Sequence, residues 1–151
     1  MAEEPSVVDA ESRRILAVRK KVRWTELGKV AIPSLDEVWK HIRANEITGC
    51  GHNVFIYRGM SILGVEASFG VEVPEGVEAP EGFVIDETPS GKAATFHQYG
   101  DYSKLIDTNL TIRQWCKQQD LKVDNISWDL YGDWDEDPTK VRTDVFYHLK
   151  T

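Results

Sequence analysis

The side chains best suited to chemistry are aromatic rings and one carboxylate that recur two residues apart in extended stretches. Asp129 and Tyr131 form one such pair, and Phe55 and Tyr57 form another. Because side chains alternate between the two faces of a strand, each pair shares one face, opposite the aliphatic residues beside it. We therefore predict that these four side chains line a common groove.

The last expected strand of the chain adds two candidates. Alternation assigns Val145, Tyr147 and Leu149 to the core. The same pattern leaves Phe146 and His148 for the groove, so the predicted ligand-binding set has six members.

An aromatic groove with one acid is suited to binding cations. Each ring face attracts a flat or quaternary cation by about 0.5–2 kcal/mol, and a positive ligand relieves the cost of a half-buried carboxylate. The same pattern also fits an ordinary core in which the rings pack on one another and Asp129 lies at the surface. The residues alone leave both interpretations open.

Periodicity and turn signals predict the elements that must position these residues. The expected strands are 15–22, 53–57, 63–73, 92–99, 128–131 and 143–149, with helices from Pro33-Ser34 to Gly49 and over 101–119. A Pro- and Glu-rich stretch, 74–82, separates two β-α-β-β halves at about 12–73 and 83–151. We therefore predict an α+β fold of duplicated βαββ units with antiparallel sheets, in which helices cover one sheet face and the other face lines the cleft between the halves.

Composition narrows the class of partner. With 25 acidic and 18 basic residues and a net charge of −7, the chain repels phosphate backbones. We expect no direct binding to nucleic acid, and the sequence before Ile15 has no room for a DNA-binding domain. Two cysteines indicate reduced thiols rather than a disulfide framework. No apolar run approaches the roughly 20 residues that span a bilayer, so we expect a cytoplasmic protein whose residues 1–11 form a flexible acidic tail.

Three other motifs do not carry chemistry. The stretch from Gly59 to Gly64 resembles a nucleophile elbow, but its second glycine is one residue late. Cys50-Gly51-His52 has no second pair of zinc ligands. Asp133, Asp135 and Asp137 begin like a calcium loop that then has Pro138 at the glycine position. We predict no metal, no cofactor and no dedicated catalytic residue.

Motif order over Ile15–Leu149 carries a family resemblance. A strand of small residues precedes His97, Gly100 and Tyr102 in the pattern H-x-x-G-x-Y. Further along, Trp128-Asp129-Leu130-Tyr131 is followed by Asp137-Pro138 and by residues 142–147. Together these segments resemble the GyrI-like family, which includes the effector-binding domains of bacterial AraC- and MerR-type multidrug-responsive activators. The resemblance implies a fold built by duplication of an SHS2-like unit.

The resemblance implies a central cleft for small molecules, and it favours the cleft over the core-only interpretation. In the family, a glutamate of a W-E-x-Y strand faces cationic ligands, and Asp129 stands at that position. Aspartate is shorter by one carbon–carbon bond, so its charge lies deeper or the ligand comes closer.

Three functions follow from the resemblance. The first is binding of small cationic or aromatic molecules for sensing or sequestration. The second is hydrolysis of reactive cyclopropane-type genotoxins, with Asp129, Tyr57 and Tyr131 as the catalytic candidates. The third is a weak protein partner such as DNA gyrase, which rests on fold analogy alone.

Overall fold

The computed structural model describes residues 4–100, 104–132 and 136–150. Its elements, in chain order, are β1 (Ser6–Ala10), β2 (Arg14–Arg23), the 3-10 helix η1 (Trp24–Glu26), α1 (Leu27–Ala44), β3 (Asn53–Arg58), β4 (Gly64–Glu72), β5 (Val84–Glu87), β6 (Gly91–Tyr99), α2 (Leu105–Gln118), β7 (Val123–Tyr131), η3 (Pro138–Lys140) and β8 (Arg142–Leu149). The order β2-α1-β3-β4 is repeated as β6-α2-β7-β8, which confirms the predicted α+β fold of two βαββ units.

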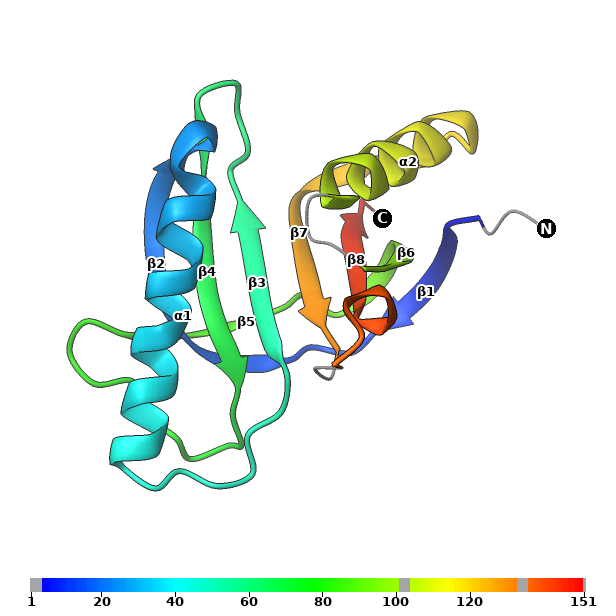
Figure 1. The fold of residues 1–151 in the computed structure, drawn as a ribbon. Helices are drawn as coiled ribbons and strands as arrows, with labels where there is room; N and C mark the ends of the chain where they lie inside the picture. Colours follow the sequence, from blue (N-terminus) through cyan, green and yellow to red (C-terminus); the bar gives the residue numbers. More distant parts are fainter. Residues whose placement is uncertain (1–3, 101–103, 133–135, 151) are drawn as a thin grey trace.

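The described strands form one sheet of eight strands in the order β1-β6-β8-β7-β3-β4-β2-β5, and all neighbouring pairs are antiparallel. Helix α1 packs on β2 and β4, whereas α2 packs on β6 and β8 (Figure 1). The central strands β3 and β7 therefore lie between the positions of the two helices, and this spacing is what leaves room for a site.

The apolar stripe of α1 follows from helical periodicity. Val38 and Ile42 are buried against β2 and β4, and Leu35 and Trp39 pack beside them. These four positions recur at intervals of three and four residues, so they lie on one side of the helix. The predicted presence of a helix over this part of the chain is confirmed.

The predicted start of the first helix is wrong. Helix α1 begins at Leu27, so Pro33 lies inside it rather than in its first turn. An interior proline removes one backbone hydrogen bond and costs about 3 kcal/mol or more. The turns before Pro33 compensate by packing, since Leu27, Val30 and Ala31 contact the cluster that contains Phe69.

The predicted loose tail is also wrong for five of its residues. Ser6–Ala10 form strand β1, which pairs antiparallel with β6 in a register that places Val8 opposite Ala93. Alternation over five residues is too short a signal to separate an edge strand from a polar tail. Pairing with β6 decides the conformation, and it is not visible from the segment itself.

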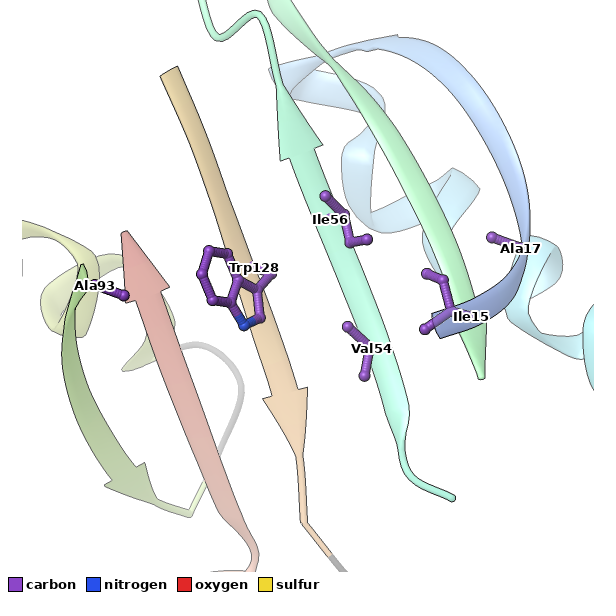
Figure 2. Close-up of a cluster of buried hydrophobic side chains, with 6 residues drawn as sticks. All are labelled: Ile15, Ala17, Val54, Ile56, Ala93 and Trp128. Atoms are coloured by element: carbon purple, nitrogen blue, oxygen red, sulfur yellow. The ribbon is translucent and has the colours of Figure 1, made fainter. Parts of the chain in front are cut away.

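The sheet face opposite the helices is a second core rather than an open groove. Figure 2 shows its six most buried members on β2, β3, β6 and β7: Ile15, Ala17, Val54, Ile56, Ala93 and Trp128. Val8 of β1 and Val84 of β5, from the two edge strands, pack against them. Strong curvature of the sheet lets its edges cover its own centre, so the prediction that this face lines the cleft is wrong.

Strand β5 was not anticipated, and it contributes a buried charge to the second core. Asp86 is 6% exposed and accepts hydrogen bonds from Arg58 at 2.6 Å and from Ser68 at 2.7 Å. Arg19 lies 3.0 Å from the same carboxylate. Burial alone would raise the pKa of Asp86, but these hydrogen bonds and the Arg58 charge outweigh it and lower the pKa to about 2.

Helix α2 is tied to the sheet by polar contacts as well as by packing. Thr108 donates a hydrogen bond to Gln98 on β6 at 2.7 Å, and Tyr147 on β8 donates one to Asn109 at 2.5 Å. Its buried residues Ile112 and Cys116 contact β6 and β8. The described helix is shorter than the predicted span of 101–119, whose first residues lie outside the described part of the chain. Neither described helix is long and apolar enough to cross a membrane.

Candidate functional site: a cleft between the two helices

A cavity of about 670 Å³ opens over the central strands on the helix-bearing face of the sheet. Strands β3, β7 and β8 supply its floor, α2 and η1 with the first residue of α1 supply opposite walls, and the loop after β3 supplies part of the rim. The lining residues are Trp24, Leu27, Tyr57, Met60, Ser61, Ile62, Leu105, Ile106, Asn109, Leu110, Arg113, Ser127, Asp129 and Tyr147. The volume suits one molecule of drug size.

Asp129 is the acidic group of this floor. Asp129 is 4% exposed, and its Oδ2 accepts a hydrogen bond from the Tyr131 hydroxyl at 3.3 Å. Tyr57, which is on the neighbouring strand, also donates to the Asp129 carboxylate. Burial raises the pKa of Asp129 to about 7, against the opposing effect of the two hydroxyl donors. Near neutral pH the side chain is therefore poised between the acid and the carboxylate.

The register explains why these three side chains meet. Ser127 lies opposite Tyr57, and Asp129 lies opposite Phe55, across the β3–β7 pair. Residues directly opposite in an antiparallel pair share a face, so Tyr57, Asp129 and Tyr131 project from the same side of the sheet. The predicted grouping of Asp129, Tyr131, Tyr57 and Phe55 on one face agrees with this register.

Phe55 supports the floor instead of lining it. It is 5% exposed and lies edge-on to Tyr131, with ring centroids 4.9 Å apart, and to Phe69, with centroids 5.0 Å apart. Edge-to-face pairs hold rings in defined orientations. Phe55 therefore fixes the Tyr131 ring, whose hydroxyl in turn reaches Asp129.

Phe146 and His148 do not face this cleft, and their predicted orientation is wrong. Phe146 lies opposite Trp128 in the β7–β8 pair and stacks on its indole, with centroids 5.2 Å apart. His148, two residues further on the same face, is 3.2 Å from both Asp124 and the Ser90 carbonyl oxygen. Tyr147 is buried in the cluster under α2, as predicted for a core residue, and it also contributes to the cavity lining.

The wall formed by α2 was missed by the sequence analysis. Leu105, Asn109 and Arg113 recur every four residues and line the cavity, as do Ile106 and Leu110 beside them. Ile106 is 72% exposed and Leu110 is 49% exposed. The sequence does contain a signal for this wall: Ile106 and Leu110 are large apolar residues outside the core-facing stripe of the helix. Such residues are typical of a contact surface.

His, Cys, Asp and Glu side chains, the potential metal ligands, occur within residues 4–100, 104–132 and 136–150. Among the described residues, no group of three or more His, Cys, Asp or Glu side chains is placed to hold a metal ion. His52 is 3.7 Å from a Glu72 oxygen, while Cys50 is partly buried. Asp133 and Asp135 of the acidic loop lie outside the described residues, and Asp137 accepts a 2.7 Å hydrogen bond from Thr139.

Two helices lie on one face of a continuous antiparallel sheet, and a cavity opens between them. This arrangement defines an α+β domain that binds small molecules. The sequence profile of the GyrI-like small molecule binding domain matches residues 3–150, and the chain belongs to this family. A comparison with curated protein sequences gives no match.

Solved structures share the fold at low sequence identity. The C-terminal domain of EcmrR superposes with a TM-score of 0.78 and 15% identity, over 100% of this chain and 99% of that one. SAV2435, solved with bound tetraphenylphosphonium, superposes with a TM-score of 0.70 and 12% identity, over 98% of this chain and 94% of that one. A hydrolase from Listeria innocua superposes with a TM-score of 0.60 and 11% identity, over 97% of this chain and 92% of that one. At these identities the likeness establishes the fold alone.

Proposed function

We propose that the cleft binds lipophilic aromatic cations, with Asp129 as the counter-charge, so that the domain senses or sequesters such molecules. One observation carries the proposal. The Asp129 carboxylate is buried on the cavity floor, and the hydrogen bonds that it accepts come from the neutral hydroxyls of Tyr57 and Tyr131. In the described part of the chain, no Lys, Arg or His is paired with it.

Energetics favour a cation in that position. A buried carboxylate without a positive partner is costly, which is why burial raises its pKa. A cationic ligand recovers the lost charge stabilisation. The ring of Tyr57, which also lines the floor, adds attraction through its negative face. We expect affinities on the order of micromolar, or about 8 kcal/mol.

Charge, not shape, is therefore expected to decide binding. Tetraphenylphosphonium and tetraphenylborate have nearly the same size and the same four phenyl groups but opposite charges. By isothermal titration calorimetry at pH 8, where Asp129 is ionised, the phosphonium is expected to bind and the borate to show no binding at the same concentrations. Equal affinities for the two ions would refute the role of Asp129 as counter-charge.

The known structures support the ligand class by analogy. SAV2435 holds tetraphenylphosphonium, and the EcmrR C-terminal domain belongs to a protein that is also solved in complex with DNA. This chain spans 57% of the EcmrR chain in that complex. A role as the effector-binding part of a regulatory system is consistent with these relatives, and a protein partner would then carry the signal.

A second candidate function is hydrolysis of cyclopropane-bearing electrophiles. The hydrogen-bonded group of Tyr57, Asp129 and Tyr131 favours it, because a carboxyl with a pKa of about 7 is suited to general acid catalysis at neutral pH. In a spirocyclopropyl cyclohexadienone, Asp129 would protonate the carbonyl oxygen while water attacks a cyclopropane carbon. The strained carbon–carbon bond breaks, a phenol forms, and the water proton returns to the carboxylate.

Product analysis by mass spectrometry distinguishes the two functions. Incubation of such a dienone with the wild-type protein would give the hydroxyethyl phenol faster than buffer does if the cleft is catalytic. Asp129→Asn would then abolish the excess rate. A rate equal to that of buffer, together with tight binding of tetraphenylphosphonium, excludes hydrolysis of this substrate and leaves the binding function.

A further inference from the structure

The charged lining of the cleft has two members of opposite sign. Of the described residues that line the cavity, Asp129 and Arg113 are the ones with an acidic and a guanidinium side chain. Asp129 lies buried on the floor, on β7, whereas Arg113 is exposed on α2 at the mouth. A ligand that fills the cavity from floor to mouth therefore meets a negative group first and a positive group last.

Arg113 is held over the cleft by contacts with two residues of its lining. The guanidinium carbon is 5.5 Å from the centroid of the Tyr147 ring, and Nη2 is 3.7 Å from the Met60 sulfur. Tyr147 and Met60 both line the cavity themselves. Stacking on an aromatic face orients the planar guanidinium while leaving its edge N–H groups available for an acceptor.

Arg113 has no anionic partner in the described part of the chain, since none of the ion pairs there includes it. Tyr147 carries the Arg113 guanidinium over its ring and lines the same cavity as Asp129. Both charged groups line one cavity, so a single ligand can contact both. A simple cation would satisfy Asp129 but would meet a second positive charge at the mouth.

We propose that the preferred ligand is zwitterionic: an aromatic cation with a carboxylate on the opposite side, whose cation lies against Asp129 and whose carboxylate pairs with Arg113. This inference rests on the proposed cation-binding function and specifies its ligand class. Planar guanidinium groups bind carboxylates through two parallel hydrogen bonds, which adds directional selection to the charge. Arg113 is then a specificity-determining residue at the entrance.

Xanthene dyes test the inference because their charges can be changed on one scaffold. Rhodamine B is a zwitterion at neutral pH, its ethyl ester is a cation without the carboxylate, and fluorescein keeps the carboxylate but lacks the cation. Dissociation constants are measured by fluorescence anisotropy at about 0.15 M salt, where weak long-range effects are screened. We expect rhodamine B to bind at least about fivefold more tightly than its ester and fluorescein to bind most weakly.

Arg113→Met is expected to abolish the difference between rhodamine B and its ester. The apolar side chain keeps much of the contact with Tyr147 but cannot pair with a carboxylate. Arg113→Lys keeps the charge without the planar fork, so it should retain only part of the preference. Lys117→Met is the matched control, because Lys117 is exposed on the same helix and does not line the cavity. It changes net charge equally and should leave the preference unchanged.

The outcomes separate this inference from the function on which it rests. Equal binding of rhodamine B and its ester to the wild-type protein, with fluorescein weak, overturns the role of Arg113 and leaves cation binding intact. A preference that persists in a folded Arg113→Met variant also overturns it, since the carboxylate is then recognised elsewhere. Fluorescein binding as tightly as rhodamine B, or no binding of either rhodamine, overturns both proposals.

Discussion

Asp129→Asn is expected to weaken tetraphenylphosphonium binding by about 5- to 150-fold, or 1–3 kcal/mol, at pH 8. The substitution keeps the size of the side chain and its ability to accept hydrogen bonds from Tyr57 and Tyr131, but it removes the charge. The melting temperature in the absence of ligand should stay the same or rise, because an unpaired buried carboxylate destabilises the folded protein.

Asp124→Asn provides a matched control on the same strand. Asp124 lies outside the cavity lining and is 3.2 Å from His148, so its replacement removes one negative charge without touching the cleft. Cation affinity should be unchanged in this variant. If Asp129→Asn instead lowers the melting temperature and leaves the affinity as it was, Asp129 is a structural residue and the proposed counter-charge is wrong.

Cation affinity is expected to fall as the pH is lowered through about 7, by up to about tenfold for each pH unit, until it reaches the affinity of Asp129→Asn. Protonation neutralises Asp129, so the ligand must displace a proton before it gains a counter-charge. Titration calorimetry in two buffers of different ionisation enthalpy should detect proton release on binding near pH 6.5. Asp129→Asn should remove both the pH dependence and the proton release.

The free energy of unfolding of the ligand-free protein should decrease as pH rises towards 7, whereas cation affinity increases. Burial raises the pKa of Asp129 from 3.8 to about 7 in the folded state. Between those values the folded protein binds more protons than the unfolded chain, so the free energy of unfolding decreases as pH rises and remains lower above pH 7. Asp129→Asn should flatten this decrease in urea unfolding measured from pH 5 to pH 8.

Asp86 contributes the opposite slope in a separate interval. Arg58 and Ser68 hold its pKa near 2 against the effect of burial, so its contribution is present above about pH 4 and is lost as pH falls towards 2. The contributions of Asp86 and Asp129 to stability can therefore be distinguished by the pH range in which each appears.

A wild-type free energy of unfolding that rises steadily from pH 5 to pH 8 would contradict the raised pKa of Asp129.

Local periodicity determined several features of the protein. The stripe of Val38 and Ile42 on α1 was predictable because a helix repeats its contacts every three to four residues. The common face of Asp129 and Tyr131, and of Phe55 and Tyr57, was predictable because a strand alternates its side chains. The division into two βαββ units followed from the same two periods and from the turn residues between them.

Only the tertiary structure decided which face of the sheet forms the cleft. Both faces carry buried apolar side chains, because curvature brings the edge strands over the face that has no helix. Alternation separates Phe146 from Tyr147, yet it does not assign either one to the cavity. Register with Trp128 placed Phe146 in the second core, and register with Ser127 placed Tyr147 on the cleft floor.

The α2 wall and the buried charges also depended on long-range contacts. Arg113 reaches the cleft only because α2 packs across β6 and β8 and stops short of the central strands. Asp86 is paired only because β5 adds to the edge of β2, beside Arg19 and Ser68. Such contacts join residues far apart in the chain, and their geometry depends on strand order and curvature, which no local pattern encodes.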